Sequence, residues 1–247
     1  MRPALAIIVL VLASGTSAQA ADDWGALYGY VAWTSDYRFY GLSESNRQPA
    51  VQAGLHWVAP ENFYAGIFVS RVNFRDFRKT SVETDFYAGR HFTFDANELN
   101  LQLLTGLYPD SAGHPSYAAP GVILPTYNFV EATATLTHTF ANKLSVSGKL
   151  LGEPSFNAAK PAAWSVIGSA NYPVRGWLAV SANVGHQWAS AALGRTYWDL
   201  GMTATHEWQW ALDLRYFGSD AGRSHCFHTN WCGSALVLKV TYTFQAL

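Results

Sequence analysis

The feature that most constrains the fold is a strict alternation of polar and apolar residues. Residues 98–103 read Glu-Leu-Asn-Leu-Gln-Leu, and residues 239–244 read Lys-Val-Thr-Tyr-Thr-Phe. Such alternation places successive side chains on opposite faces of a β-strand, one apolar and one polar. No stretch shows a convincing helical period. The sequence therefore predicts an all-β protein.

The alternating segments are also long. Most of them span about 9–14 residues, whereas strands of soluble proteins average about five or six and a tilted membrane strand needs about 9–11. The sequence predicts twelve strands, near residues 26–38, 48–59, 63–74, 81–94, 98–109, 127–140, 143–151, 163–174, 177–189, 197–207, 210–218 and 234–244.

Short and long connections alternate along the chain. The short ones carry turn residues, such as Pro60-Glu61-Asn62 and Asp95-Ala96-Asn97, and the long ones include residues 110–126 and 219–233. Outer-membrane barrels sort their connections in this way, with short periplasmic turns and longer external loops. We therefore expect a single transmembrane antiparallel β-barrel with both termini in the periplasm. A soluble sandwich or a lipocalin-like barrel is the alternative.

Composition favours a surface that faces lipid. Aromatic residues make up 15% of the chain and charged residues 13%, against about 25% charged in ordinary soluble domains. No later segment approaches the roughly 20 apolar residues of a membrane helix. Nothing suggests a nucleic-acid partner.

Aromatic residues gather near the predicted strand ends, as interface girdles require: Trp57, Phe63, Phe74, Phe92, Tyr108, Tyr127, Phe140, Trp177, Trp188, Trp198, Trp210 and Tyr216.

The two ends of the chain carry export signals. Residues 1–20 begin with Arg2, continue with an apolar core over residues 4–13 and end in Ala18-Gln19-Ala20, which predicts a cleaved signal peptide; the apolar run is too short for a membrane anchor. Residues 21–247 would then form the barrel, in a Gram-negative outer membrane. The last strand, ending at Phe244, resembles the signal read by the outer-membrane assembly machinery, although three residues follow the aromatic.

Alternation also predicts which residues face the barrel interior. The uncharged ones are Asn100, Gln102, Asn183 and Gln187. The predicted charged pore-lining residues are Asp36, Arg38, Glu83, Asp85, Glu98, Glu131, Lys143, Lys149, Asp199, Glu207, Asp213, Arg215 and Lys239. Because acidic residues outnumber basic ones, we expect ion pairs and at most a weak preference for cations. An open pore and an interior filled by these side chains both fit the sequence.

Four segments carry a resemblance to a known family. They are TSDYRFYGLSES at residues 34–45, QPAVQAGLHW at 48–57, FYAGIFVSRV at 63–72 and ETDFYAGR at 83–90. These segments resemble the TorF-type porins, a proteobacterial family of largely unassigned function. The resemblance implies an outer-membrane barrel with solute passage, and supplies neither a substrate nor catalytic residues. Tyr40 stands where the family usually has Arg, and Glu44 where it usually has Gln.

The two cysteines, Cys226 and Cys232, lie in the last long loop. An exported protein meets an oxidising compartment, so we predict a disulfide that closes this loop. His225 and His228 flank the pair, and a Cys/His metal site is the alternative, but the pattern lacks a second ligand pair. We therefore expect no metal and no cofactor.

We interpret the chain as a porin-like channel for passive or weakly selective diffusion of small polar solutes. The alternatives are a plugged structural or adhesive barrel, and an outer-membrane lipid-modifying hydrolase. Ser181, Asn183 and His186 are the best local hydrolase candidates, but alternation places His186 on the opposite face and no Gly-x-Ser-x-Gly elbow is present. Glu83 and Asp85 could hold Ca²⁺ or act as acid and base, although lumen ion pairs explain them as well. We predict no enzymatic activity and no catalytic residue.

Two loops bear on the passage of solutes. The third loop, residues 110–126, is long enough to fold inward and narrow the lumen. In SDYRFYGLSES, at residues 35–45, Asp36 and Arg38 would share the inward face at the upper end of the first strand, with the chain entering an external loop at Gly41. Their expected role is an ion pair or a charged lip of the pore.

Overall fold

The protein forms a closed antiparallel barrel of twelve strands, with two short strands inside it. The structure, a computed structural model, describes residues 24–75, 79–111, 126–154, 162–189 and 194–246. The barrel strands are β1 Ala26–Thr34, β4 Ala50–Val58, β5 Phe63–Arg71, β6 Val82–Phe94, β7 Asn97–Leu107, β8 Phe129–Thr139, β9 Ser145–Glu153, β10 Ala163–Arg175, β11 Leu178–Trp188, β12 Arg195–His206, β13 Trp210–Ser219 and β14 Ala235–Gln245. The two short strands are β2 Arg38–Phe39 and β3 Leu42–Ser43.

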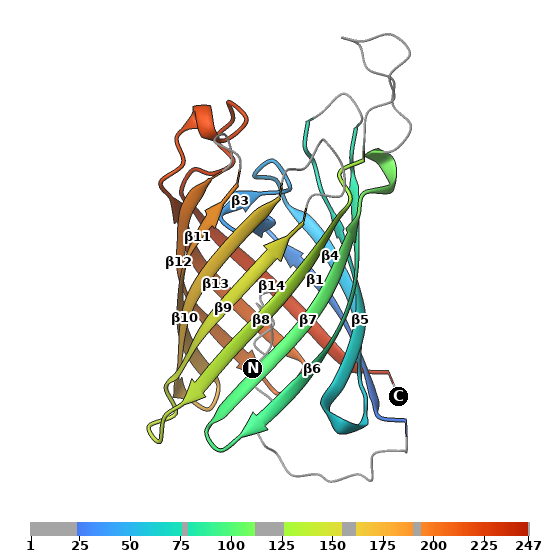
Figure 1. Cartoon of the computed structure of the whole chain (residues 1–247), viewed down its shortest axis with the longest axis vertical. Coiled ribbons are helices and arrows are strands. Elements are labelled where there is room, and N and C mark those ends of the chain that lie inside the picture. Colours follow the sequence, from blue (N-terminus) through green and yellow to red (C-terminus); the bar gives the residue numbers. More distant parts are fainter. Residues whose placement is uncertain (1–23, 76–78, 112–125, 155–161, 190–193, 247) are drawn as a thin grey trace.

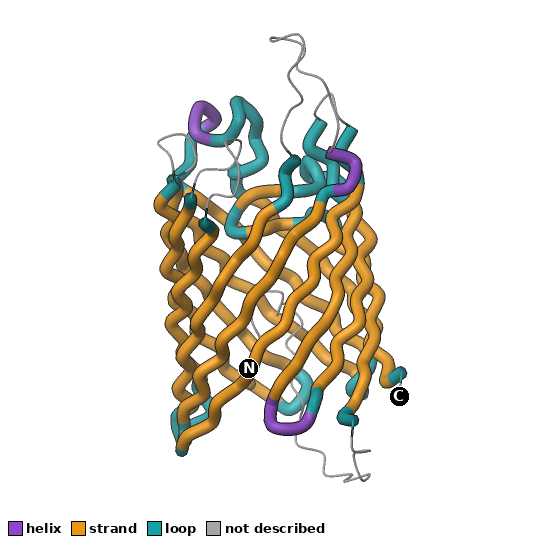
Figure 2. The backbone as a smooth tube through the Cα atoms, turned by 45° about the vertical axis from the view of Figure 1, so that its right-hand side comes forward, coloured by secondary structure: helices purple, strands orange, loops and turns teal. Residues whose placement is uncertain are grey.

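Each strand pairs with its neighbour along the chain, and β1 pairs with β14 to close the barrel. Closure leaves no strand edge unpaired, which the interior of a lipid bilayer requires. Figure 1 shows the tilted strands, with the short turns at one end and the longer connections at the other. β1 begins and β14 ends at the short-turn end (Figure 1), and Figure 2 shows the strands forming the wall of the barrel, with loops and turns at its two ends. The predicted twelve-stranded barrel and its sorting of connections are confirmed.

Alternation decides which side chains face outward. On β12, Trp198, Leu200 and Met202 are exposed, while Tyr197 and Thr203, on the other face, are buried. The same pattern on the other strands gives the barrel an apolar outer surface and a polar interior, the arrangement of a barrel surrounded by lipid. No helix among the described residues is long and apolar enough to cross a membrane.

Three aromatic residues do not lie where we expected them. Phe74, Tyr108 and Tyr127 were predicted to belong to the outer girdles, but they pack together in an inward cluster with Phe129. Each lies just beyond the end of a barrel strand, where alternation no longer fixes the direction of a side chain. Tyr108 is buried and the rings of Phe74 and Tyr127 are half-buried, instead of facing lipid.

Candidate functional site

The first long connection does not extend outward from the barrel. β1 ends at Thr34, four residues earlier than predicted, and the chain turns into the barrel as the β2–β3 hairpin. Its residues contact strands around the lumen: Tyr37 packs on Phe68 of β5, Phe39 on Phe129 of β8, and Tyr40 on Tyr197 of β12. We call residues 35–49 the inward segment. Figure 1 places β3 within the upper part of the barrel.

A buried carboxylate holds the inward segment together. Asp36 accepts hydrogen bonds from Arg38 Nε at 2.8 Å, from Ser43 Oγ at 2.6 Å and from Ser45 Oγ at 3.1 Å. All four residues are buried. A buried charge is tolerated only when it is paired and hydrogen-bonded. These bonds explain physically why Asp, Arg and two Ser occur together within SDYRFYGLSES.

The turn of the hairpin has demanding backbone geometry. Arg38 pairs with Ser43 and Phe39 with Leu42, which leaves Tyr40 and Gly41 as a two-residue turn with φ values of 46° and 79°. Two-residue hairpin turns of this type require positive φ at both positions. A Cβ atom on Gly41 would lie 2.5 Å from Cβ of Tyr197. Glycine is therefore required here both for its backbone conformation and for its lack of a side chain.

Tyr40 reaches the opposite wall of the barrel. Its hydroxyl donates to the Glu131 carboxylate on β8 at 3.0 and 3.1 Å and accepts a hydrogen bond from Lys149 Nζ on β9 at 3.0 Å. Arg195 Nε on β12 donates to the Tyr40 carbonyl at 3.0 Å. Burial, reinforced by the nearby negative charge of Glu131, raises the pKa of the Tyr40 hydroxyl well above its usual value. Tyr40 is therefore a neutral hydrogen-bonding group, and these contacts hold the tip of the hairpin against three strands.

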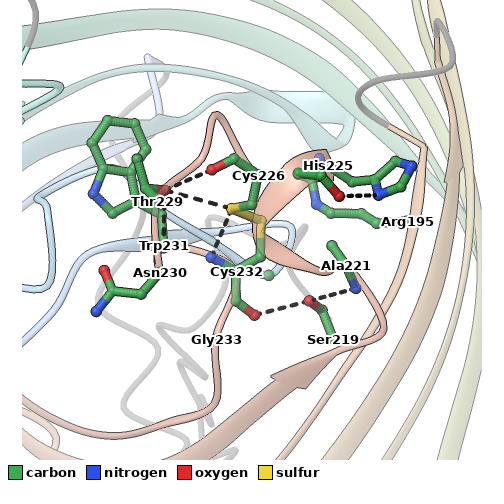
Figure 3. The surroundings of a disulfide bond; sticks show 12 residues. Arg195, Ser219, Ala221, His225, Cys226, Thr229, Asn230, Trp231, Cys232 and Gly233 are labelled. Carbon is green, nitrogen blue, oxygen red and sulfur yellow. Dashed lines mark hydrogen bonds between the residues drawn. A yellow bond between two sulfur atoms is a disulfide. The ribbon is translucent and has the colours of Figure 1, made fainter.

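The predicted disulfide between Cys226 and Cys232 is confirmed. Figure 3 shows it within the β13–β14 loop, where Ser219 Oγ donates to the Cys232 carbonyl at 2.8 Å. Because the two sulfur atoms are bonded to each other, neither is a free thiolate for the alternative metal site. No group of three or more His, Cys, Asp or Glu suited to a metal ion is present in the described part of the chain.

The disulfide loop also secures the inward segment. Trp231 Nε1 donates to Asn46 Oδ1 at 2.9 Å, and the Trp231 carbonyl accepts the backbone N–H of Ser43 at 3.1 Å. The Gly233 carbonyl accepts a hydrogen bond from Arg38 Nη1 at 2.8 Å. Arg47 donates to the carbonyls of residues 230 and 234 at 3.0 and 2.9 Å. The inward segment is thus attached both to the barrel wall and to the neighbouring loop.

We expect loss of the disulfide to loosen the inward segment. Cys226→Ser/Cys232→Ser removes a cross-link whose closure of a short loop contributes about 2 kcal/mol, so the Trp231 and Gly233 contacts become less well ordered. Amide hydrogen exchange of residues 35–49 is expected to be faster in this variant. Ser224→Ala, an exposed change in the same loop, is the control. Equal exchange rates in the double-cysteine variant and the control would show that the disulfide does not hold the segment.

Below the inward segment, charged side chains form a network on β11 to β13. Arg215 forms ion pairs with Asp199 and, at 3.1 Å, with Asp213. It also donates to Ser181 Oγ at 2.8 Å, and Asn183 Nδ2 donates to Asp199 at 2.7 Å. Arg215 therefore compensates most of the negative charge of Asp199 and Asp213. Lys239 lies opposite Asp213 in the register of β13 and β14 and is the next cation beside this network.

The other wall of the lumen is aromatic and acidic. Tyr108 donates to Glu83 at 2.7 Å, and Tyr64 donates to Asn100 and Gln102 at 2.8 and 3.0 Å. Asp85, two residues after Glu83, is also buried. A wall of this kind offers hydrogen-bonding groups and negative charge to whatever enters the lumen.

Most predicted pore-lining residues lie on inward faces, but two do not. Asp36, Arg38, Glu83, Asp85, Glu131, Lys149, Asp213 and Arg215 are buried, and Glu98, Asp199 and Lys239 are partly exposed. Lys143 and Glu207 instead lie exposed in turns, with φ values of 68° and 49°. The strands end before these residues, and each tight turn takes one residue into the left-handed region. The part played by the others in solute passage stays a prediction.

Two predicted segments fall on residues outside those that the structure describes. They are residues 112–125, which make up most of the third loop, and residues 1–20. The inward fold of the loop and the signal peptide therefore stay predictions.

The hydrolase candidates do not converge. Ser181 accepts a hydrogen bond from Arg215 inside the barrel, whereas His186 packs on Trp188, whose side chain is exposed. The two residues therefore lie on opposite faces of β11, as alternation predicted.

A cavity of about 860 Å³ lies between the hairpin and the disulfide loop. Aromatic rings line it on one side, and Glu153, Gln187 and Arg195 lie on strand ends around it. Sequence reasoning placed Gln187 inward but missed Glu153 and Arg195. Alternation could have located these two residues, because Glu153 continues the inward-facing series of β9 and Arg195 continues that of β12. They were missed because the predicted strand that corresponds to β9 ended at residue 151 and the one that corresponds to β12 began at residue 197.

A family model for bacterial proteins of unknown function, Gcw_chp, matches residues 18–245. The chain belongs to the Gcw_chp family. This match covers nearly all of the chain, and it does not confirm the narrower TorF-type label. No curated protein matches the sequence.

Solved structures show which fold this Gcw_chp protein has. The KdgM porin superimposes with a TM-score of 0.58 at 7% identity, covering 88% of this chain and 98% of that one. An outer membrane channel from Pseudomonas putida F1 gives 0.59 at 12% identity, covering 91% and 97%. The NanC porin gives 0.56 at 9% identity, covering 90% and 100%. At these identities the likeness shows the fold alone, a closed antiparallel barrel like those of these porins.

Proposed function

We propose that this Gcw_chp protein is an outer-membrane channel for passive or weakly selective diffusion of small polar solutes, and that the inward segment sets its narrowest point. The observation that carries the proposal is a closed barrel with a charged, hydrogen-bonding interior that one ordered segment crosses. The porin fold and the resemblance of the signature segments to TorF-type porins support it. In this proposal the protein is exported by its signal peptide, inserted by the assembly machinery and surrounded by lipid.

The plugged barrel is the second candidate, because the inward segment is bonded to several strands and to the disulfide loop. Both functions share the fold, and they differ in whether ions cross. Purified, folded protein in planar bilayers is the test. Discrete current steps support the channel, and their absence supports the plug.

The buried charges suggest which ions pass more easily. Among the described residues, buried carboxylates outnumber buried cations by seven to four. The carboxylates are Asp36, Glu44, Glu83, Asp85, Glu131, Glu153 and Asp213, and the cations are Arg38, Lys149, Arg195 and Arg215. A net negative interior lowers the energy of a passing cation and raises that of an anion.

We therefore expect K⁺ to be more permeant than Cl⁻, by about twofold or more, in a reversal-potential measurement under a KCl gradient. Glu131→Gln should reduce this preference, and Glu61→Gln, in an exposed short turn, should leave it unchanged. A preference for Cl⁻ would contradict the expected effect of a negative interior.

A KdgM structure in complex with disordered oligogalacturonate is known, but the acidic interior of the present chain disfavours a polyanion of that kind.

A further inference from the structure

One cation lies on the outer wall of the barrel, where most of the neighbouring side chains are apolar. On β6 alternation directs Glu83 inward and directs Phe86, Arg90 and Phe92 outward. Arg90 lies close to the end of β6 at Phe94, toward the short turns (Figure 1), which mark the periplasmic end of an outer-membrane barrel. We propose that Arg90 binds the phosphodiester of a glycerophospholipid in the periplasmic leaflet.

Two aromatic rings hold the guanidinium of Arg90 against the wall. Its Cζ atom lies 4.5 Å from the centre of the Phe63 ring and 5.0 Å from the centre of the Phe92 ring. Phe63 begins β5 and is the direct partner of Arg90 in the β5–β6 register. Both rings are exposed, as is usual for an aromatic girdle at the depth of the lipid headgroups. Cation–π contacts of this kind position a guanidinium and leave its N–H groups available to donate.

The described residues supply no strong partner for the charge of Arg90. Its Nε atom is buried and has no hydrogen-bond partner. Glu61 Oε2, in the turn between β4 and β5, lies 3.8 Å from Nη2, which is longer than a hydrogen bond. The Glu61 side chain is 76% exposed, and an ion pair at that exposure contributes little. A ligand that brings its own negative charge would therefore supply what Arg90 lacks.

A lipid phosphate suits both the charge and the surroundings of Arg90. A planar guanidinium can donate to two phosphate oxygens side by side. Farther from the short turns the outer wall is apolar: Ala88 precedes Arg90 on the same face of β6, and its partner in the β6–β7 register, Leu103, is exposed. Leu101, the partner of Arg90 itself, is exposed as well. These side chains would contact the acyl chains of the lipid, whereas a water-soluble anion gains nothing from them.

The inference goes beyond the proposed function. Arg90 faces away from the lumen, so a lipid bound there neither narrows the channel nor meets a solute that crosses it. The bound phosphate would instead hold the adjoining ends of β5 and β6 at the depth of the headgroups.

Native mass spectrometry of the full-length, folded protein in detergent tests the inference by measuring bound lipid. The probes are dioleoylphosphatidylethanolamine, dioleoylphosphatidylglycerol and dioleoylglycerol, which has the same chains without a phosphate. We expect both phospholipids to bind about tenfold more tightly than dioleoylglycerol, and Arg90→Gln to remove this difference. Arg71→Gln is the matched control, because Arg71 is an exposed cation at the other end of β5, and it should bind lipid as the wild type does.

A second variant guards against a folding defect in Arg90→Gln, which heat-modifiable mobility would reveal. Phe92→Leu keeps the cation and removes one ring, so phospholipid binding should weaken about threefold while dioleoylglycerol binding stays the same. Phospholipids that bind no more tightly than dioleoylglycerol would overturn the inference, as would Arg90 and Phe92 variants that bind as Arg71→Gln does. These outcomes are separable from failure of the proposed channel, because lipid binding in micelles does not depend on ion flow.

Discussion

Replacing the inward segment with a short turn is expected to raise single-channel conductance about threefold or more, because the lumen then has the width of an unobstructed twelve-stranded barrel. The replacement is feasible because Thr34 and Ala50 are direct partners in the β1–β4 register. A three-residue turn, Ser35 followed by Asn-Gly, suits such a pair of strands, because it places glycine at the position that needs positive φ. Ser35 is retained, because its backbone N–H donates to the Leu238 carbonyl at 2.8 Å.

The matched control changes a turn at the other end of the barrel. Asp95-Ala96 joins β6 to β7 and is replaced by Asn-Gly in the same way. The control should conduct as the wild type does. Equal conductance of the segment-replaced barrel and the wild type would show that the narrowest point lies elsewhere.

Asp36→Ala should release the inward segment while leaving the barrel folded. The substitution leaves the buried guanidinium of Arg38 without its carboxylate partner, and a change of this kind costs about 3–5 kcal/mol in other proteins. It also removes the oxygen that accepts hydrogen bonds from the hydroxyls of Ser43 and Ser45. The segment can avoid this cost by leaving the lumen, since the strand pairing of the barrel does not depend on it. Conductance should therefore rise toward that of the segment-replaced barrel, with little change in the heat-modifiable mobility of the barrel.

The paired variant Asp36→Ala/Arg38→Met separates charge from packing. It removes both charges, and an apolar replacement of a buried ion pair is often tolerated, so conductance should return toward the wild-type value. Hydrogen exchange over residues 35–49 reports the same release directly. Slow exchange in Asp36→Ala would mean that the remaining contacts suffice to hold the segment.

The barrel was predictable because its strands are specified locally. Each strand must present apolar residues to lipid at every second position, so the alternation in residues 98–103 and 210–216 shows directly which residues belong to each face. The disulfide was predictable for a related reason, since Cys226 and Cys232 are the only two cysteines.

The inward segment was not predictable from pattern alone. Residues 34–38 continue the alternation of β1, with Thr34, Asp36 and Arg38 all buried, so a strand that ends at residue 34 looks the same as one that ends at residue 38. What turns the chain inward is contact with Glu131, Tyr197 and Gly233, far away in the sequence. The cavity was missed because its residues lie at or beyond strand ends, where periodicity no longer predicts direction, as Phe74 and Tyr127 show.

The current carried by the folded, full-length wild-type protein in a planar bilayer tests the proposed channel most directly. We predict small discrete steps that favour K⁺ and that become several times larger when the inward segment is replaced by a turn. A folded, heat-modifiable barrel that gives no steps, either before or after the replacement, would contradict the claim that this protein is a channel narrowed by its signature segment.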